Sequence, residues 1–181
     1  MSTARYATPM IALHWLMLGL IAIVYACMEF RSEFPRGSEP RELMKAIHFS
    51  GGLSVLILVF ARLMLRFRQG TPPIRPPLSR LASLSAGAGH AALYVFMIAM
   101  PLLGWLLLSA EGDAIRLWGL SLPALISPDP AFAHQIEEWH ELGGTLGYWL
   151  IGLHAAAGLG HHYLRRDDTL QRMLPFRGRR A

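Results

Sequence analysis

The sequence predicts an all-α integral membrane protein, a four-helix up-and-down bundle in one domain that covers residues 1–181. Hydrophobic residues make up 53% of the chain and charged residues only 16%, whereas a soluble domain carries about a quarter charged residues. The charges are also clustered, so that four stretches contain no Asp, Glu, Lys or Arg. These stretches are residues 6–28, 46–61, 81–110 and 142–164.

Each uncharged stretch predicts one helix. Three of them contain the ~20 residues that a helix needs to cross a bilayer. The second stretch is shorter, and it crosses only if Lys45 and Arg62 extend their charged ends toward the two surfaces. We expect transmembrane helices at about residues 9–28, 43–65, 87–110 and 141–164.

The segments between these helices have the composition of loops. Residues 29–42 alternate in charge around two prolines and a glycine, as expected of a solvated outer loop. Residues 70–77 include four prolines, which cannot continue a helix. Residues 111–139 form the longest predicted loop, which can hold a short interfacial helix near residues 131–139.

The basic residues are distributed unevenly between the two ends of the predicted bundle. Twelve of the 17 Lys and Arg residues lie near the chain termini or between the second and third uncharged stretches, and five lie in the two other loops. Basic residues gather on the cytoplasmic side of membrane proteins, so both termini are expected in the cytoplasm. The net charge of +5 therefore reflects membrane orientation and does not indicate a nucleic-acid partner.

The uncharged stretches contain histidines at depths that match in pairs. His140 and His154 are fourteen residues apart, which places both imidazoles on nearly the same helix face, roughly 21 Å apart along the axis. His14 matches the depth of His154 on the cytoplasmic side, and His48 is the best match for His140 on the outer side. Ionisable residues inside a membrane are costly and mark functional sites. Spacing alone leaves another explanation open, in which one histidine lies at the interface and the other is satisfied in the core.

Two facing imidazoles without further ligands suit the axial positions of a haem iron, because the porphyrin supplies the other four nitrogens. Zinc sites and cation pathways normally add thiolates or carboxylates, and the four stretches contain none apart from Cys27, the only cysteine. We therefore expect His14, His48, His140 and His154 to be haem ligands. Glycines can open slots for the ring or serve close helix packing; they are Gly51, Gly52, Gly143, Gly144, Gly147, Gly152, Gly158 and Gly160.

Several short stretches carry a family likeness, namely Cys27–Arg31, Thr71–Ile74, Gly147–Ala157, His161–Tyr163 and Asp168–Leu170. Together with the four histidines, they resemble the bacterial cytochrome b561 family, and most closely its small members that oxidise superoxide. The resemblance implies two haem b groups, each held by two of the histidines, in a bundle in the bacterial inner membrane. It further implies an oxidoreductase that passes electrons from periplasmic superoxide to ubiquinone, giving dioxygen and ubiquinol.

Two further residues are candidates for the cytoplasmic side. Arg62 lies fourteen residues after His48, so it shares that face and can pair with a haem propionate, a quinone headgroup or a lipid phosphate. His161 lies seven residues after His154, roughly 10 Å nearer the cytoplasm, where it can bond a quinone carbonyl and exchange protons. Its alternative role is to anchor the helix end. A hydrogen bond at the interface is expected of His90.

Two other functions stay open at this point. One is a membrane electron-transfer subunit that passes electrons between a periplasmic partner protein and the quinone pool. The other is a haem-free cation transporter. No residue is assigned as catalytic, because an iron with two axial histidines has no open position and superoxide would react at the haem edge. The first outer loop balances its basic residues with glutamates, so attraction of an anion depends on local placement.

Overall fold

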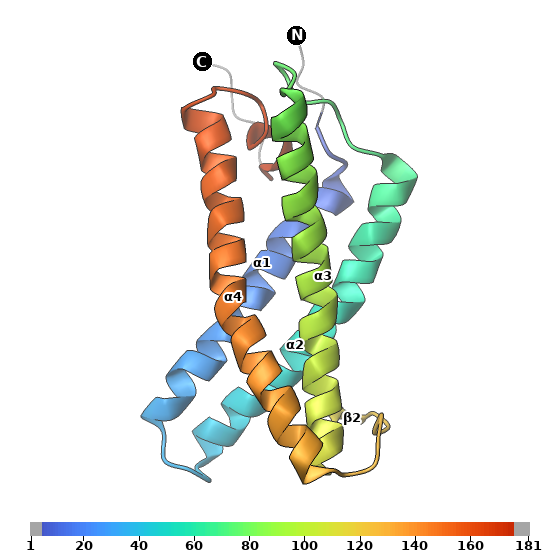
Figure 1. Ribbon diagram of the computed structural model, residues 1–181, viewed down its shortest axis with the longest axis vertical. Coiled ribbons are helices and arrows are strands. Elements are labelled where there is room, and N and C mark those ends of the chain that lie inside the picture. The colour runs from blue at the N-terminus through green and yellow to red at the C-terminus, as the bar shows by residue number, and fades with distance from the viewer. Residues whose placement is uncertain (1–4, 176–181) are drawn as a thin grey trace.

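The computed structural model describes residues 5–175, in which four long helices dominate (Figure 1). They are α1 (Thr8–Phe30), α2 (Glu39–Gln69), α3 (Arg80–Glu111) and α4 (Pro130–Tyr163). Two 3-10 turns follow α1 and α4, namely η1 (Arg31–Glu33) and η2 (Gln171–Met173). An antiparallel pair, β1 (Arg116–Leu117) and β2 (Leu120–Ser121), lies between α3 and α4.

The helices run up and down, and the first and last described residues lie at the same end of the bundle (Figure 1). We call this the terminal end, and the opposite end, with the β1–β2 hairpin, the hairpin end. α1 packs on α2, α2 on α3, and α3 on α4. In Figure 1 the α1–α2 pair lies behind the α3–α4 pair and is tilted relative to it.

The surface of the bundle is apolar along most of its length. Phe60 is 54% exposed, Val95 65% and Leu153 67%, and lipid tails accommodate such side chains whereas water does not. By length and composition, α1 with η1, α2 and α3 can each cross a membrane. α4 has 34 residues, but its histidines, glycines and glutamates make it less apolar. The fourth membrane crossing therefore stays a prediction.

Residues 131–139 form the first turns of α4, so the prediction of a separate interfacial helix was wrong. The carboxylate of Asp129 accepts hydrogen bonds of 3.1 Å from two backbone N–H groups of the first turn, and Pro130 suits the first helical position. Ile136 is fully buried in a cluster with Ala110 of α3. This packing gives the early turns of α4 a partner along α3, so the helix continues without a break.

The side chain of Tyr25 in α1 reaches α4 at one close point, where glycines leave room for it. A Cβ atom added to Gly147 would overlap the hydroxyl of Tyr25 and lie 2.5 Å from the ring of Phe96. The same Tyr25 hydroxyl donates a 2.8 Å hydrogen bond to the carbonyl of Gly144. These contacts leave no space for a side chain at position 147, and two other helix contacts are similarly tight, those at Gly51 and Gly143.

Replacement of Gly147 by Leu is expected to destabilise the bundle, because the new side chain would displace Tyr25 and Phe96. Overpacking of this kind costs about 1–3 kcal/mol, and thermal unfolding of the purified protein in detergent measures it. Gly152→Leu is the matched control, since a Cβ at Gly152 meets nothing within 4 Å. Equal unfolding temperatures for the two variants would contradict the tight contact of Gly147 with Tyr25 and Phe96.

Candidate functional site

His48 of α2 and His140 of α4 face each other toward the hairpin end, and we call them the outer pair. Their ring centroids are 6.1 Å apart, with an angle of 74° between the ring planes. The Nδ1 of His48 lies 3.0 Å from the carbonyl oxygen of Val24 in α1, so Nδ1–H donates to it and Nε2 keeps its lone pair. The Nδ1 of His140 is buried and has no hydrogen-bond partner within the described residues.

His14 of α1 and His154 of α4 form a second pair toward the terminal end, the inner pair. Their centroids are 6.3 Å apart, and the angle between the ring planes is again 74°. His90 of α3 adds a third ring, with its centroid 5.4 Å from that of His154. Arg62 of α2 places Nη1 2.9 Å from Nδ1 of His14. All four helices therefore contribute a polar side chain to a site that surrounds a cavity of about 70 Å³.

The separation within both pairs fits two axial ligands of one haem iron. Two iron–nitrogen bonds of about 2 Å and two ring radii of about 1.1 Å place such centroids about 6.2 Å apart. Within residues 5–175, His, Cys, Asp and Glu do not converge in groups of three that could hold a bare metal ion. A porphyrin, which brings four nitrogens of its own, is therefore the chemistry that two imidazoles suit.

Space for a flat ring lies one helical turn from three of these histidines. Gly52, Gly144 and Gly158 each follow a paired histidine by four residues and are half-buried. A Cβ added to any of them would meet nothing within 4 Å. Six of the glycines selected from the sequence thus divide into two kinds. Gly51, Gly143 and Gly147 serve close packing, whereas Gly52, Gly144 and Gly158 border open space.

Arg62 sets a condition on the inner pair. Its guanidinium can only donate, so Nδ1 of His14 accepts the bond between them and the ring proton lies on Nε2. Coordination of iron through Nε2 would require Nδ1 to carry the proton and Arg62 to move to another acceptor, such as a carboxylate. The residues fit a haem with that adjustment, and a propionate is the acceptor that haem itself would supply.

His90 differs from its expected interfacial role. Its Nδ1 lies 2.7 Å from the carbonyl of Ala86 in the same helix. A hydrogen bond was expected of His90, but the contact of its ring with the inner pair was not. The sequence contained a signal for this position. His90 follows Arg80 by ten residues, nearly the spacing of His14 from Arg5, so the two histidines reach similar depths.

His161 lies at the end of α4 and does not contact Arg62. Its Nδ1 is 2.5 Å from Oδ2 of Asp167, a residue that the sequence analysis did not select. No periodicity could have found Asp167, because it follows the end of α4 and is brought back by a turn. Burial raises the pKa of the Asp167 carboxyl, but hydrogen bonds from His161 and Thr169 outweigh this effect and hold the pKa below its usual value.

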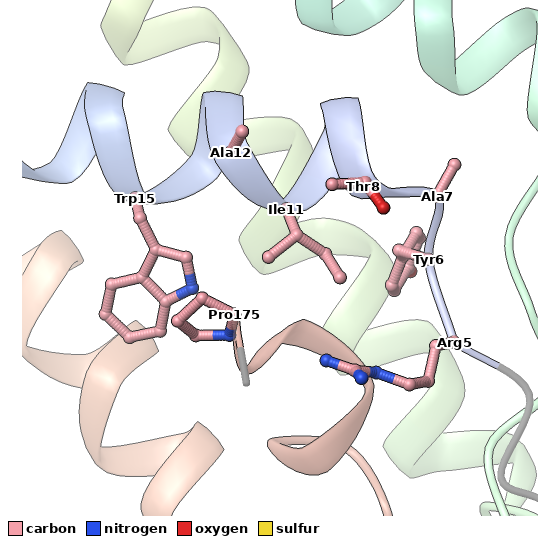
Figure 2. Close-up of a pocket in the computed structure, with 8 residues that line it drawn as sticks. All are labelled: Arg5, Tyr6, Ala7, Thr8, Ile11, Ala12, Trp15 and Pro175. Atoms are coloured by element: carbon pink, nitrogen blue, oxygen red, sulfur yellow. The ribbon is translucent and has the colours of Figure 1, made fainter. Parts of the chain in front are cut away.

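A pocket of about 360 Å³ opens at the terminal end of α1. Figure 2 shows Ile11 and Trp15 pointing from α1 toward Pro175, with Arg5 and Tyr6 closing the other side. Trp15 follows His14 directly, and its Nε1 donates a 2.7 Å hydrogen bond to a backbone carbonyl of the C-terminal segment. The pocket thus joins an apolar wall to a cationic side chain close to the inner pair.

One basic side chain, that of Arg31, acts on the outer pair. The field of Arg31 acts on His48, and Arg41 holds the backbone around Arg31 by donating to its carbonyl oxygen at 3.2 Å. Glu29, two residues before Arg31, accepts a 2.5 Å hydrogen bond from the hydroxyl of Tyr148. Arg31 therefore brings positive charge to the outer pair, although the basic and acidic residues of the loop balance each other overall.

Paired histidines inside an apolar helical bundle define the class of membrane b-type cytochromes. The sequence model described as prokaryotic cytochrome b561 matches residues 5–176. The chain belongs to the prokaryotic cytochrome b561 family, whose members are haem-binding membrane proteins of electron transfer. This membership is inconsistent with the haem-free cation transporter considered from the sequence.

Individual relatives extend the likeness over the whole bundle. The chain is 38% identical to cytochrome b561 homolog 1 of Escherichia coli (strain K12) over 173 residues, which cover 96% of this chain and 98% of that protein. It is 37% identical to probable superoxide oxidase CybB of Yersinia pestis over 171 residues, 94% of this chain and 96% of the relative. Cytochrome b561 homolog 2 of Escherichia coli (strain K12) is 28% identical over 178 residues, with coverage of 94% and 91%.

Proposed function

We propose that the protein is a dihaem superoxide:ubiquinone oxidoreductase of the bacterial inner membrane. The observation that carries the proposal is the presence of two histidine pairs with centroid separations of 6.1 and 6.3 Å. His140 and His154 lie on one helix, roughly 21 Å apart along its axis. Haem b bound at each pair supplies a one-electron carrier, so the two pairs provide a path across most of the membrane.

Superoxide is the proposed electron donor at the outer pair. Oxidation of two superoxide anions gives two molecules of dioxygen and two electrons. A haem held by both histidines of the outer pair would offer superoxide no ligand position, so the transfer would take place at the edge of the site, near the positive charge of Arg31. One relative, 37% identical, has the name probable superoxide oxidase, which supports this donor.

Ubiquinone is the proposed acceptor toward the terminal end. One ubiquinone takes up two electrons and two protons to become ubiquinol, so its headgroup needs both the inner pair and access to water. Arg62 contacts His14, and His161 is near the surface with 20% of its side chain exposed. The excess of basic residues that the sequence predicts on this side favours a cytoplasmic location, where protons for the quinone are available.

A periplasmic protein is the alternative electron donor, and one surface feature supports it. The hairpin end exposes Trp118 to 63%, Leu120 to 65% and Leu125 to 47%, and apolar residues gathered at one end favour a protein partner. The protein would then be an electron-transfer subunit that accepts electrons from a periplasmic protein. The purified protein tests this alternative directly, because such a subunit would not be reduced rapidly by superoxide alone.

Removal of one histidine from a pair is expected to remove one haem. His48→Ala or His140→Ala should abolish the outer haem, and His14→Ala or His154→Ala the inner one, because one imidazole leaves the iron without its second axial ligand. Pyridine haemochrome content and the redox-resolved absorption spectrum measure both losses. His90→Ala is the control and should keep both haems. Full haem content in all four ligand variants would rule out the assignment.

Arg31→Gln is expected to slow the reduction of the haems by superoxide about tenfold, because steering by local charge raises the encounter rate of an anion by about 10–10³. Stopped-flow absorption at increasing ionic strength measures this effect, since salt should slow the unmodified protein toward the rate of the variant. Arg36→Gln in the exposed part of the same loop is the matched control. Equal rates for the two variants would place the entry of superoxide elsewhere.

Reporters fused to the chain test its orientation. A reporter attached after Ala181 is expected to show a cytoplasmic location, and one inserted into the loop of residues 112–129 a periplasmic location. Alkaline phosphatase and a fluorescent protein, which are active on opposite sides of the inner membrane, provide the two signals. Phosphatase activity at the C-terminus would invert the proposed direction of electron transfer.

A further inference from the structure

The segment after α4 folds back across the terminal end of the bundle. Asp168 pairs with Arg75 of the α2–α3 link through two hydrogen bonds, from Asp168 N to Arg75 O at 3.1 Å and from Arg75 N to Asp168 Oδ1 at 2.9 Å. Arg172 is 1% exposed, donates to the carbonyl of Pro72, and has its guanidinium carbon 5.2 Å from the centroid of the Tyr6 ring. A segment held at so many points places its side chains reproducibly.

This fold brings Asp167 against the last turn of α4. Its Oδ2 lies 2.5 Å from Nδ1 of His161, and its side chain is 2% exposed while that of His161 is 20% exposed. The other oxygen, Oδ1, accepts a 3.0 Å hydrogen bond from the backbone N–H of Thr169, and the N–H of Asp167 donates to the carbonyl of His161 at 3.1 Å. Both carboxylate oxygens and the backbone are therefore engaged, which fixes the direction of the carboxylate.

We propose that Asp167 is a positioning residue that makes His161 the entry point for the protons consumed in quinone reduction. The inference rests on the proposed function, because it requires a quinone acceptor on this side. A carboxylate at Nδ1 fixes the imidazole tautomer and stabilises the imidazolium, so proton exchange is confined to Nε2. The buried Asp167 cannot exchange protons with water as easily as the partly exposed His161.

The proton balance follows from the stoichiometry of the reaction. Each ubiquinone receives two electrons through the inner pair and two protons from the cytoplasm. The Nε2–H bond of the His161 imidazolium breaks as a quinone oxygen takes the proton, and a hydronium ion of the cytoplasm then returns a proton to Nε2 and leaves as water. The cycle occurs twice for each ubiquinol, and Asp167 keeps its charge throughout.

Other described charged and titratable groups of this segment make no hydrogen bond to His161. The carboxylate of Asp168 accepts through Oδ1 from the backbone N–H of Arg75, while its Oδ2 is buried without a hydrogen-bond partner within residues 5–175, and Arg172 is held by Pro72 and Tyr6. The ring of His162 packs on Tyr163, with centroids 4.8 Å apart. Asp167 is thus the one carboxylate in hydrogen-bond contact with His161 among the described residues, and the pH response of the site should depend on this pair.

The experiment measures reoxidation of the dihaem protein without using superoxide. Protein reduced with stoichiometric dithionite is mixed anaerobically with a short-chain ubiquinone, and haem reoxidation is followed between about pH 5.5 and pH 9. Asp167→Asn should keep both haems but slow reoxidation at least about tenfold. The pH profile of its rate should also differ from that of the unmodified protein, because the amide no longer fixes the tautomer of His161. Asp167→Glu should restore much of the rate.

Two controls separate this role from a structural one. Asp168→Asn makes the same change at the neighbouring position and should keep the rate and the pH profile. His161→Gln should slow reoxidation as much as Asp167→Asn, and the double variant should be no slower than either, because the two residues act as one unit. Additive effects, or an unchanged pH profile in Asp167→Asn, would overturn the inference.

The outcome also distinguishes this inference from the proposed function. If the unmodified protein is not reoxidised by quinone, both the acceptor and the proton entry are wrong. If it is reoxidised but superoxide does not reduce it, only the donor is wrong and the role of Asp167 is unaffected. Normal quinone kinetics in Asp167→Asn would leave the oxidoreductase intact and exclude the His161–Asp167 pair.

Discussion

An imidazole inside an apolar bundle is costly unless it has a hydrogen-bond or metal partner, and this cost organises most of the polar contacts of the structure. An unpaired buried polar group costs about 2–7 kcal/mol, and the protein contains several imidazoles along its helices. His48 and His90 direct Nδ1 to backbone carbonyls, His14 contacts Arg62, and His161 contacts Asp167. In the first two, the hydrogen bond at Nδ1 leaves the Nε2 lone pair available, as in histidines that bind metals.

α4 carries three of the candidate functional histidines, and it is less apolar than α1 and α3 as a result. It contributes one histidine to each pair and carries His161 in its last turn, and its glycines include both tightly packed and open positions. A helix with so many imidazoles and glycines is a weaker membrane span than α1 or α3, which are the most apolar. Burial of Ile136 against α3 and the Tyr25–Gly144 hydrogen bond offset part of this loss by joining α4 to two neighbouring helices.

The sequence predicted what depends on spacing along one helix. Charge-free stretches indicated the helices, and depth indicated which histidines would lie side by side; their function as ligands stays a prediction. Features that depend on rotation between helices could not be predicted. The contact of Arg62 with His14, and that of His90 with His154, are set by how α2 and α3 turn toward the inner pair. The return of Asp167 to His161 depends on a turn without periodicity, and the start of α4 at Pro130 depends on packing against α3.

The separation of the two pairs along α4 has an electrical consequence. An electron that passes from the outer to the inner pair moves roughly 21 Å along the helix, most of a hydrocarbon layer of about 30 Å. In an energised cell the cytoplasm is negative, so this electron moves against the membrane potential, and a full crossing at 100 mV requires about 2.3 kcal/mol. On the proposed function, oxidation of superoxide would therefore charge the membrane as well as remove a toxic anion, and its driving force would fall as the membrane became more polarised.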